Sequence, residues 1–523
     1  MLKSLQRDCP SDPIHADVAV VGGGLAGLFL ADRLAQSGLT VVVLESGSAK
    51  QELGTHPLNC VEVLGEIYGG AEHGRFRCLG GTSTRWGGAL LPYLKTDLDP
   101  HPLSLNQGWG IRSCDLEAHL ERIEKTFGVQ QGTYEGGGDL EGLLPGFLPR
   151  LPKWPVFANR NTANLFRKRI KQSRTLSVWL NATVTEILVE DGETRGLVAA
   201  NANGARIEVR APEVVLAAGA IETTRILLLL NEAHDGRLLP KEMPLGQGFH
   251  DHISAPIADL EVEDRNEIIR LFSFRFVRGG MRNLRFELSP HMRGVDRLPA
   301  AFAHVAFYRD GESGFDGLRK IFQSIQRHRF PAIRDVLQVL RDAPWFFAAV
   351  HWRFIGKRVL PPTGSSFELH LVTEQASRTA NRITLSSTKK DVFGQPLAAI
   401  QWRINQEDED AFWRVAQQLA TTWRAGEIVS CARLKMRDRS TVLDNLKDAG
   451  GIYHPAGTTR IGNSASDGVV DEQLRVHGVK GLRALATSVF PSVGGSSPSL
   501  ALIEFALRMA DDIVNPQRRQ QEA

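Results

Sequence analysis

The chain of 523 residues contains few cysteines and no apolar run long enough to span a membrane. Its five cysteines are scattered and odd in number, and no C-x-x-C or metal-type spacing occurs. We therefore expect reduced thiols in a cytoplasmic protein, and no metal site. Residues 1–16 contain neither an apolar h-region nor a twin arginine, so no signal peptide is expected.

Other motifs are also missing. The net charge of +3 is too small to indicate a nucleic-acid partner. The sequence has no P-loop, no G-x-S-x-G nucleophile elbow and no internal repeat. A second G-x-G-x-x-G does not follow any other strand-like segment, which favours a single bound dinucleotide. The length allows two or three domains, and the 42% hydrophobic content is ordinary for a globular enzyme.

The most informative motif present is Gly22-Gly23-Gly24-Leu25-Ala26-Gly27, which contains G-x-G-x-x-G. An apolar run at 18–21 precedes it and predicts a buried strand. Helical apolar spacing follows at 28–35, and a second apolar run at 41–44 ends at Glu45. Strand, glycine turn, helix, strand and acid stand in the order that a dinucleotide site needs.

Each residue of this motif has a predicted role. Gly22 permits the tight turn, and Gly24 lets the backbone approach a pyrophosphate at the helix N-terminus. Gly27 lets the helix pack closely on the strand, and Glu45 lies about 20 residues on, where an acid accepts hydrogen bonds from a ribose. The motif alone leaves open whether the nucleotide is FAD or NAD.

A second glycine-rich loop, Cys78 to Gly88, contains G-G-T-S-x-x-W-G-G. Its backbone N–H groups, hydroxyls and Trp86 suit an anion or a flat ring. This loop resembles the flavin-contacting loop of the glucose–methanol–choline (GMC) oxidoreductases. Further blocks resemble motifs of the same family and occur in the same order: 214–227, 245–252, 453–462, 468–479 and 488–500.

The resemblance implies FAD as the cofactor and an α/β fold, α+β overall. A Rossmann-like FAD-binding domain, discontinuous in sequence, would be joined by a substrate domain built on an antiparallel sheet with helices. We expect the FAD-binding domain at 15–95, 175–255 and 448–515, the substrate domain at 255–447, and a connecting or lid segment at 96–174.

The residues also predict elements of the substrate domain. Apolar strand-like runs lie at 284–288, 367–374 and 397–404. An amphipathic helix is expected at 406–424, with Phe412, Val415, Leu419 and Trp423 on one face, which we interpret as core.

The FAD contacts that the resemblance implies come from several segments. Val184 is expected to offer its backbone to the adenine. The full set of expected cofactor residues is Gly22, Gly24, Leu25, Ala26, Gly27, Glu45, Gly81, Thr82, Ser83, Trp86, Gly87, Gly88, Val184, Ala218, Gly219, Ala486, Pro498 and Ser499. Thr84-Arg85-Trp86 lacks the histidine that some sugar-oxidising relatives use to bond the flavin, so non-covalent FAD is expected.

His454 occupies the position of the family's catalytic histidine, and an imidazole has the pKa of a base for a hydroxyl proton. His477 is interpreted as structural, while His250 and His252 stay open. The family's second catalytic position, Asn or His, is occupied by Ser497. Ser497 could orient the hydroxyl, a side chain of the substrate domain could replace the missing partner, or the chemistry could be altered.

The resemblance therefore implies an FAD-dependent enzyme that oxidises a CH–OH group of a sugar, polyol or other alcohol by hydride transfer to flavin N5. The alternative is a non-redox, flavin-containing lyase on the same fold. The sequence identifies neither the substrate nor the electron acceptor.

Residues 317–360 combine helical apolar spacing with many cations, including Arg327, Arg329, Arg334 and Arg341. Two interpretations are a lid with a solvated basic face and a contact with an anionic membrane surface. An acidic substrate is a third.

Overall fold

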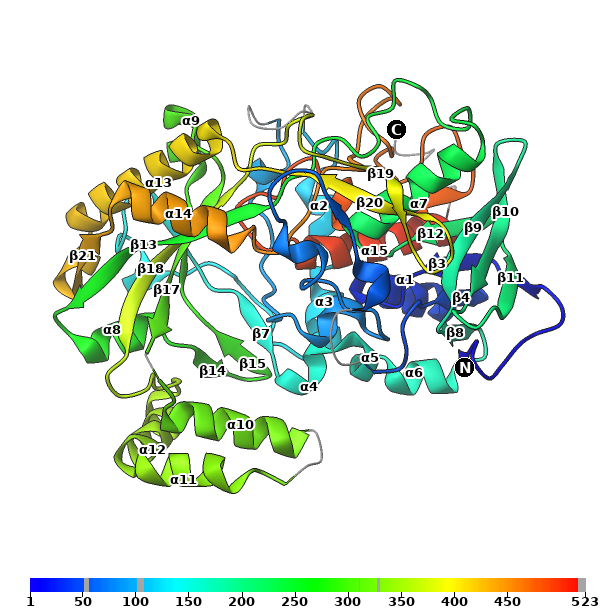
Figure 1. The fold of residues 1–523 in the computed structure, drawn as a ribbon. Coiled ribbons are helices and arrows are strands. Elements are labelled where there is room, and N and C mark those ends of the chain that lie inside the picture. Colours follow the sequence, from blue (N-terminus) through cyan, green and yellow to red (C-terminus); the bar gives the residue numbers. More distant parts are fainter. Residues whose placement is uncertain (51–55, 101–107, 310, 327–329, 516–523) are drawn as a thin grey trace.

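The computed structural model describes residues 1–50, 56–100, 108–309, 311–326 and 330–515. A parallel six-stranded sheet forms the centre of one half of the molecule (Figure 1). Its Val-rich strands are buried, as is typical of parallel sheets covered on both faces. In spatial order they are β1 (Leu2–Ser4), β8 (Leu176–Leu180), β4 (Val41–Leu44), β3 (Val18–Val21), β12 (Glu213–Leu216) and β22 (Leu482–Ala484).

Three helices pack around this sheet. Helix α1 (Leu25–Gln36) follows the glycine turn after β3, and helix α15 (Ser499–Val514) lies beside it although the two are far apart in sequence (Figure 1). Helix α7 (Ala220–Ala233) follows β12. A four-stranded sheet lies nearby, in the order β2 (Ile14–His15), β11 (Arg206–Arg210), β10 (Glu193–Ala200) and β9 (Thr183–Glu190).

The other half is built on an antiparallel six-stranded sheet. One face carries apolar side chains, such as Phe286, Leu369 and Leu371, in a core shared with helices α13 (Gln406–Ala425) and α14 (Arg439–Ala449). Polar residues alternate with them on the other face. The strands are β21 (Ala432–Met436), β13 (His252–Val262), β18 (Ser366–Glu374), β17 (Ala301–Tyr308), β16 (Arg285–Leu288) and β6 (Phe147–Arg150).

Two small sheets complete the architecture. One joins β14 (Arg275–Val277), β15 (Gly280–Arg282) and β7 (Lys153–Pro155). The other joins β19 (Arg382–Lys390), β20 (Pro396–Gln401) and β5 (Glu62–Val63), and its strands β19 and β20 pack on α7. The expected connecting segment thus contributes strands to two sheets, β6 and β7.

The remaining helices are short or lie in one insertion. Helices α10, α11 and α12 with the turn η6 form a group between β17 and β18 (Figure 1). No helix in the described part of the chain is both long and apolar enough to cross a bilayer. Their bounds are α2 (Ser113–Glu117), α3 (Leu120–Phe127), α4 (Phe157–Arg160), α5 (Thr162–Leu165), α6 (Arg167–Gln172), α8 (Arg265–Phe272), α9 (Pro290–Asp296), α10 (Gly314–Gln326), α11 (Ile333–Arg341), α12 (Ala343–His351) and η6 (Trp352–Gly356).

The expected fold class is confirmed: a parallel sheet with helices stands beside an antiparallel sheet with helices. The predicted helix at 406–424 is α13, and two of the predicted strands are β16 and β18. The strand expected at 397–404 is β20, which ends at Gln401. The domain boundaries stay a prediction.

Candidate active site

A large cavity opens at the carboxyl ends of the parallel strands, where open α/β sheets place ligands. Its empty volume is about 1420 Å³ including the open mouth. Its lining runs from the glycine turn at Gly22 to His454, so the cavity connects the nucleotide fingerprint with the predicted base. The wall comes from the turn after β3, the end of β4, the loop 74–86, the start of α7, and residues 453–455, 485–487 and 498–502.

The glycine turn leaves room for a ligand at the start of α1. Helix α1 begins after Gly24 with no side-chain cap, so N–H groups of its first turn stay available. A Cβ on Gly24 would meet only the Cα of Gly81, at 3.9 Å, and a Cβ on Gly219 would meet nothing within 4 Å. No side chain fills the space beside these two glycines, which leaves room for a pyrophosphate at the N-terminus of the helix.

Gly27 has a different role and does not line the cavity. A Cβ at this position would lie 2.1 Å from the carbonyl oxygen of Gly22, so only glycine lets α1 approach β3 this closely. Gly22 itself has a φ of +106°, a backbone conformation that favours glycine. The packing roles predicted for both glycines agree with this geometry.

Glu45 is buried at the cavity wall at the end of β4. Its Oε2 accepts a hydrogen bond from the N–H of Gly23 at 2.9 Å, and its Oε1 accepts one from the N–H of Gly47 at 2.8 Å. Oε1 also accepts from the Ser46 hydroxyl at 3.4 Å, so Oε2, with one of its two lone pairs unused, is the oxygen that can still accept a bond from a ligand hydroxyl. Val184 lines the same cavity from β9.

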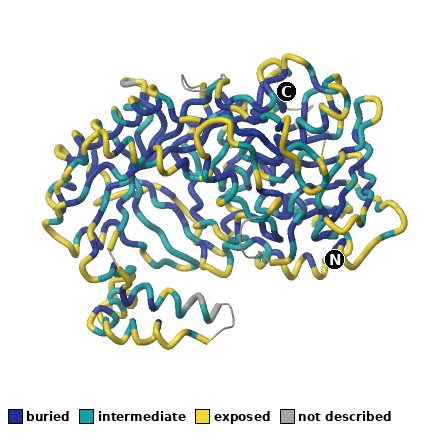
Figure 2. Tube along the Cα trace, viewed as in Figure 1, coloured by how far each residue is buried: buried dark blue, intermediate teal, exposed yellow. Residues whose placement is uncertain are grey.

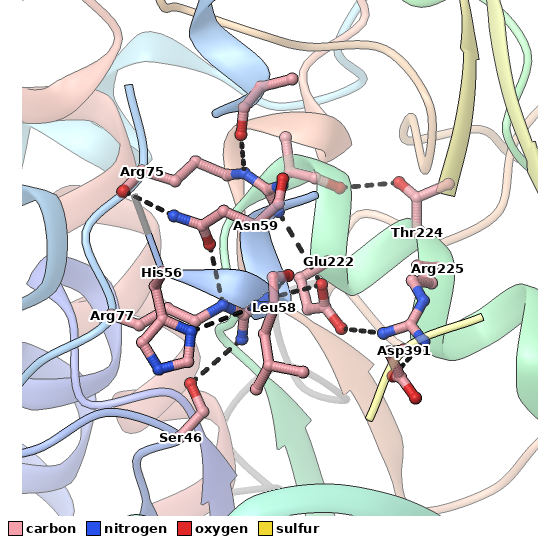
Figure 3. Close-up of polar contacts among 12 residues, drawn as sticks. Ser46, His56, Leu58, Asn59, Arg75, Arg77, Glu222, Thr224, Arg225 and Asp391 are labelled. Atoms are coloured by element: carbon pink, nitrogen blue, oxygen red, sulfur yellow. Dashed lines mark hydrogen bonds and ion pairs between the residues drawn. The ribbon is translucent and has the colours of Figure 1, made fainter. Parts of the chain in front are cut away.

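A buried cluster of arginines around Glu222 forms another part of the wall (Figure 3). Arg77 donates to Glu222 Oε2 at 2.8 Å and Arg225 donates to Oε1 at 2.9 Å, while Arg75 lies 3.8 Å away. Burial alone would raise the pKa of Glu222, but these guanidinium groups lower it to about 2. Arg225 also pairs with Asp391 at 2.6 Å. Of this cluster, Arg75, Arg77 and Glu222 line the cavity, so the wall presents two cations against one carboxylate, a surplus that suits an anionic ligand.

The histidine predicted as the base, His454, lies at the cavity and is held through its backbone. Asp251 accepts hydrogen bonds from the N–H of His454 at 2.8 Å and of Tyr453 at 2.9 Å. It also accepts from the hydroxyl of Tyr68 at 2.8 Å and the N–H of His252 at 2.6 Å. Tyr453 has a φ of +70°, uncommon for a residue other than glycine, and these bonds hold the turn in that conformation.

His454 contacts His252, the first residue of β13. The two Nδ1 atoms are 3.1 Å apart, and His252 Nε2 lies 2.8 Å from the carbonyl oxygen of Gly494. A carbonyl only accepts, so His252 Nε2 must carry a proton, and in the neutral ring its Nδ1 is then an acceptor. His454 Nδ1 must therefore donate. This assignment leaves His454 Nε2 unprotonated, with a lone pair available as a base.

Burial keeps both imidazoles neutral. It lowers the pKa of His252 to about 4 and the pKa of His454 well below its usual value. His252 and the cation of Arg285 lower the pKa of His454 further. At neutral pH the pair therefore carries no charge, as the tautomer assignment requires.

The donor atoms of Asp251, His252 and His454 lie within 4.8 Å of one another, as metal ligands could. The four hydrogen bonds to Asp251 and the two made by His252 account for this proximity instead. Burial raises the pKa of Asp251 to about 7, and the four donated bonds act in the opposite direction. We interpret the group as a set of hydrogen bonds that holds the 453–454 turn in place, and not as a metal centre.

Arg285, at the start of β16, faces the same region. Its guanidinium lies 4.8 Å from the ring centre of Phe302, and the Phe302 and His252 rings are 6.4 Å apart. Its buried Nε has no hydrogen-bond partner among the described residues, although buried charges are normally paired. The cation is therefore free to act electrostatically on the histidine pair.

Two segments of the chain match models of known protein families. Residues 377–506 match the family described as GMC oxidoreductase, and residues 17–56 match an FAD binding domain. The chain is thus similar to GMC oxidoreductases over the matched region. It is similar to the 6'''-hydroxyparomomycin C oxidase of Streptomyces lividus, with 24% identity over 95% of this chain and 91% of that protein. It is also similar to the oxygen-dependent choline dehydrogenase of Photobacterium profundum, with 22% identity over 95% and 93% of the two chains.

Two solved structures have a similar fold. Formate oxidase from Aspergillus oryzae superposes with a TM-score of 0.58 at 17% identity, covering 98% of this chain and all of that one. An FAD-dependent oxidoreductase from Chaetomium thermophilum gives a TM-score of 0.59 at 17% identity, covering 96% of this chain and all of that one. At such identities the likeness concerns the fold alone.

The cavity of this chain fits FAD by its own residues. The uncapped start of α1, the open space beside Gly24 and Gly219, and the cationic wall suit a pyrophosphate. Most of the residues predicted as cofactor contacts line the cavity, as does the predicted base His454. Four predicted site residues are not among its lining: Gly27, Gly87, Gly88 and Ser497.

Sequence reasoning missed several residues of the site. Tyr68, Arg75 and Arg77 lie outside every motif, whereas Asp251 in the 245–252 block and Arg225 in the 214–227 block were assigned no role. His252 was left open, although its place in the 245–252 block beside a buried strand signals proximity to the junction of the two halves. Arg285 carries no signal in the sequence, since an arginine at the start of a strand is ordinarily solvated.

Proposed function

We propose that this protein is a GMC oxidoreductase that oxidises the CH–OH group of a sugar, polyol or other alcohol to a carbonyl. The observation that carries the proposal is the hydrogen-bonded pair His252–His454 at the cavity, which leaves His454 Nε2 unprotonated. Relatives named as oxidases or dehydrogenases of hydroxyparomomycin, choline and 5-(hydroxymethyl)furfural support an alcohol substrate.

FAD, when bound, supplies the acceptor for a hydride. It would be held by the glycine turn and α1, by Glu45 and by the loop at 81–86, without a covalent bond. His454 accepts the hydroxyl proton at Nε2 as the hydride leaves the carbon, and the C–O bond becomes a carbonyl. Each substrate molecule thus loses one proton to the protein and one hydride to the cofactor.

His252 is a positioning residue in this proposal. By accepting from His454 Nδ1 it fixes the tautomer that exposes the Nε2 lone pair. It comes from the substrate half of the molecule, as a replacement for the family's second catalytic side chain would. Since its own Nε2 is bonded to Gly494, it acts through His454 and not on the substrate.

The test is anaerobic mixing of the FAD-loaded enzyme with sugars, polyols and aliphatic alcohols, following the bleaching of the flavin absorption. His454→Ala should retain FAD and slow bleaching by about 10²–10⁴-fold, the usual contribution of a general base. His477→Ala is the matched control, because His477 bonds the Gly462 carbonyl outside the cavity. Equal rates in His454→Ala and wild type would contradict the base assignment, and no bleaching by any alcohol would favour a non-redox lyase.

The role of His252 has its own readout. His252→Gln keeps a side chain that can accept from His454 Nδ1, whereas His252→Leu removes the acceptor. We expect the glutamine variant to bleach faster than the leucine variant at equal FAD content. If both variants slow flavin bleaching equally, His252 contributes packing alone.

A further inference from the structure

The insertion between β17 and β18 is set off from the rest of the molecule. We call residues 314–356, from α10 to η6, the arm. Figure 1 shows it below the antiparallel sheet, and Figure 2 shows that much of its trace is exposed. Its internal packing is tight, because a Cβ on Gly317 of α10 would lie 2.7 Å from the carbonyl oxygen of Asp335 in α11. The helices of the arm therefore pack closely against one another.

Helix α11 presents its apolar face to solvent. Four large apolar side chains recur at i, i+3, i+4 and i+7, the spacing of one helix face. Asp335, on the other side of the helix, is buried. The exposed fractions of the apolar residues are 78% for Ile333, 40% for Val336, 46% for Leu337 and 64% for Leu340.

The same exposure continues into α12 and η6. In the described residues, nine of the twenty exposed large apolar side chains lie within the 26 residues 330–355. This concentration exceeds the scattered single residues that are normal on a soluble surface. Beyond α11 they are Phe330, Phe347, Val350, Phe354 and Ile355.

The arm region is also strongly basic. Residues 314–358 contain nine Lys and Arg against three Asp, a net charge of +6. The whole chain carries +3, so the other 478 residues sum to −3. Arg334 is 81% exposed within the apolar helix α11, while the predicted contacts Arg327 and Arg329 lie outside the described residues.

We propose that the arm docks the enzyme on an anionic lipid bilayer. Apolar side chains of α11, α12 and η6 would enter the boundary between headgroups and acyl chains, and the cations would contact the headgroups. A second copy of the chain fits less well, because a two-fold interface brings the same basic patch of both copies together, and like charges repel. A closed lid would bury the apolar stripe of α11 against the body, whereas the structure leaves it exposed.

The experiment uses full-length, FAD-loaded enzyme and sedimentation with vesicles. One set contains phosphatidylcholine alone and the other phosphatidylcholine mixed with phosphatidylglycerol. Wild type should sediment with the anionic set and be released as salt is raised, because surface charges are screened. Arg334→Glu with Arg341→Glu should weaken binding at least about 20-fold, since each cation near an anionic surface contributes about fivefold.

A matched pair of variants separates the arm from general surface apolarity. Leu337→Glu with Leu340→Glu changes the arm, and Val295→Glu with Val392→Glu makes an equivalent change at exposed apolar residues elsewhere. The first pair should abolish vesicle binding and leave flavin content and anaerobic bleaching unchanged, and the second should bind like wild type. Size-exclusion chromatography with light scattering is run on all variants.

Three results would overturn the proposal. The first is a wild type that fails to bind anionic vesicles. The second is a Val295→Glu, Val392→Glu variant that loses vesicle binding as the arm variant does. The third is a wild-type oligomer that dissociates in the Leu337→Glu, Leu340→Glu variant, because a second copy of the chain would then cover the apolar face of the arm. None of these results touches the proposed alcohol oxidation, which is measured without vesicles.

Discussion

Helices α11 and α13 have similar apolar spacing, but their apolar faces have opposite environments. In α13 the stripe is fully buried against the antiparallel sheet; its members are Phe412, Val415, Leu419 and Trp423. In α11 the stripe is exposed on the arm. The spacing of apolar residues therefore predicts a helix and its apolar face, whereas what covers that face depends on the neighbouring elements.

The largest expected difference concerns stability. Leu419→Ala in α13 should lower the free energy of unfolding by about 2–5 kcal/mol, because it leaves a cavity in the core. Leu340→Ala in α11 should change it by less than about 0.5 kcal/mol, because the side chain is mostly exposed. Thermal unfolding followed by circular dichroism compares the two identical substitutions. If both variants lose a similar amount of free energy of unfolding, the apolar face of α11 is covered in solution.

A second contrast concerns a buried and an exposed cation. The charge of Arg285 helps to lower the pKa of His454, so Arg285→Leu should raise that pKa. The base then becomes protonated at a higher pH, and the acidic limb of the kcat/KM profile should move to higher pH. Arg285→Lys, which retains the charge, and Arg334→Leu on the arm should leave the limb in place. If the acidic limb of the kcat/KM profile stays in place in Arg285→Leu, the charge of Arg285 does not lower the pKa of His454.

The smallest expected effect concerns the helix starts. Asn405 caps α13 by accepting from the N–H of Asp408 at 2.9 Å, whereas α11 begins after Ala332 without a side-chain cap. Asn405→Ala should cost about 1 kcal/mol of stability, and Ala332→Asn should stabilise the arm by a similar amount. Thermal unfolding tests the first, and hydrogen exchange of the α11 amides tests the second. If the α11 amides exchange at the same rate in Ala332→Asn as in wild type, the N–H groups at the start of α11 already have hydrogen-bond partners.

Much of the dinucleotide site is predictable because it is local in sequence. Strand β3, the glycine turn, helix α1 and strand β4 occupy about 30 consecutive residues, and the roles of Gly22 and Gly27 follow from backbone sterics alone. The placement of Val184 and Ala486 at the same cavity came from the family resemblance, since nothing local links them to the glycine turn.

The sequence by itself determined the class of fold, the nucleotide fingerprint, and His454 as the candidate base, because each depends on short-range spacing or on resemblance to a family motif. Tertiary structure decided the rest. His252 meets His454 across 202 residues of chain, and the Glu222 cluster joins Arg75 and Arg77 of one loop to Glu222 and Arg225 of helix α7. The exposure of α11 was decided in the same way. The spacing of apolar residues predicts which side of the helix is apolar, whereas the packing of elements distant in sequence determines whether that side is buried.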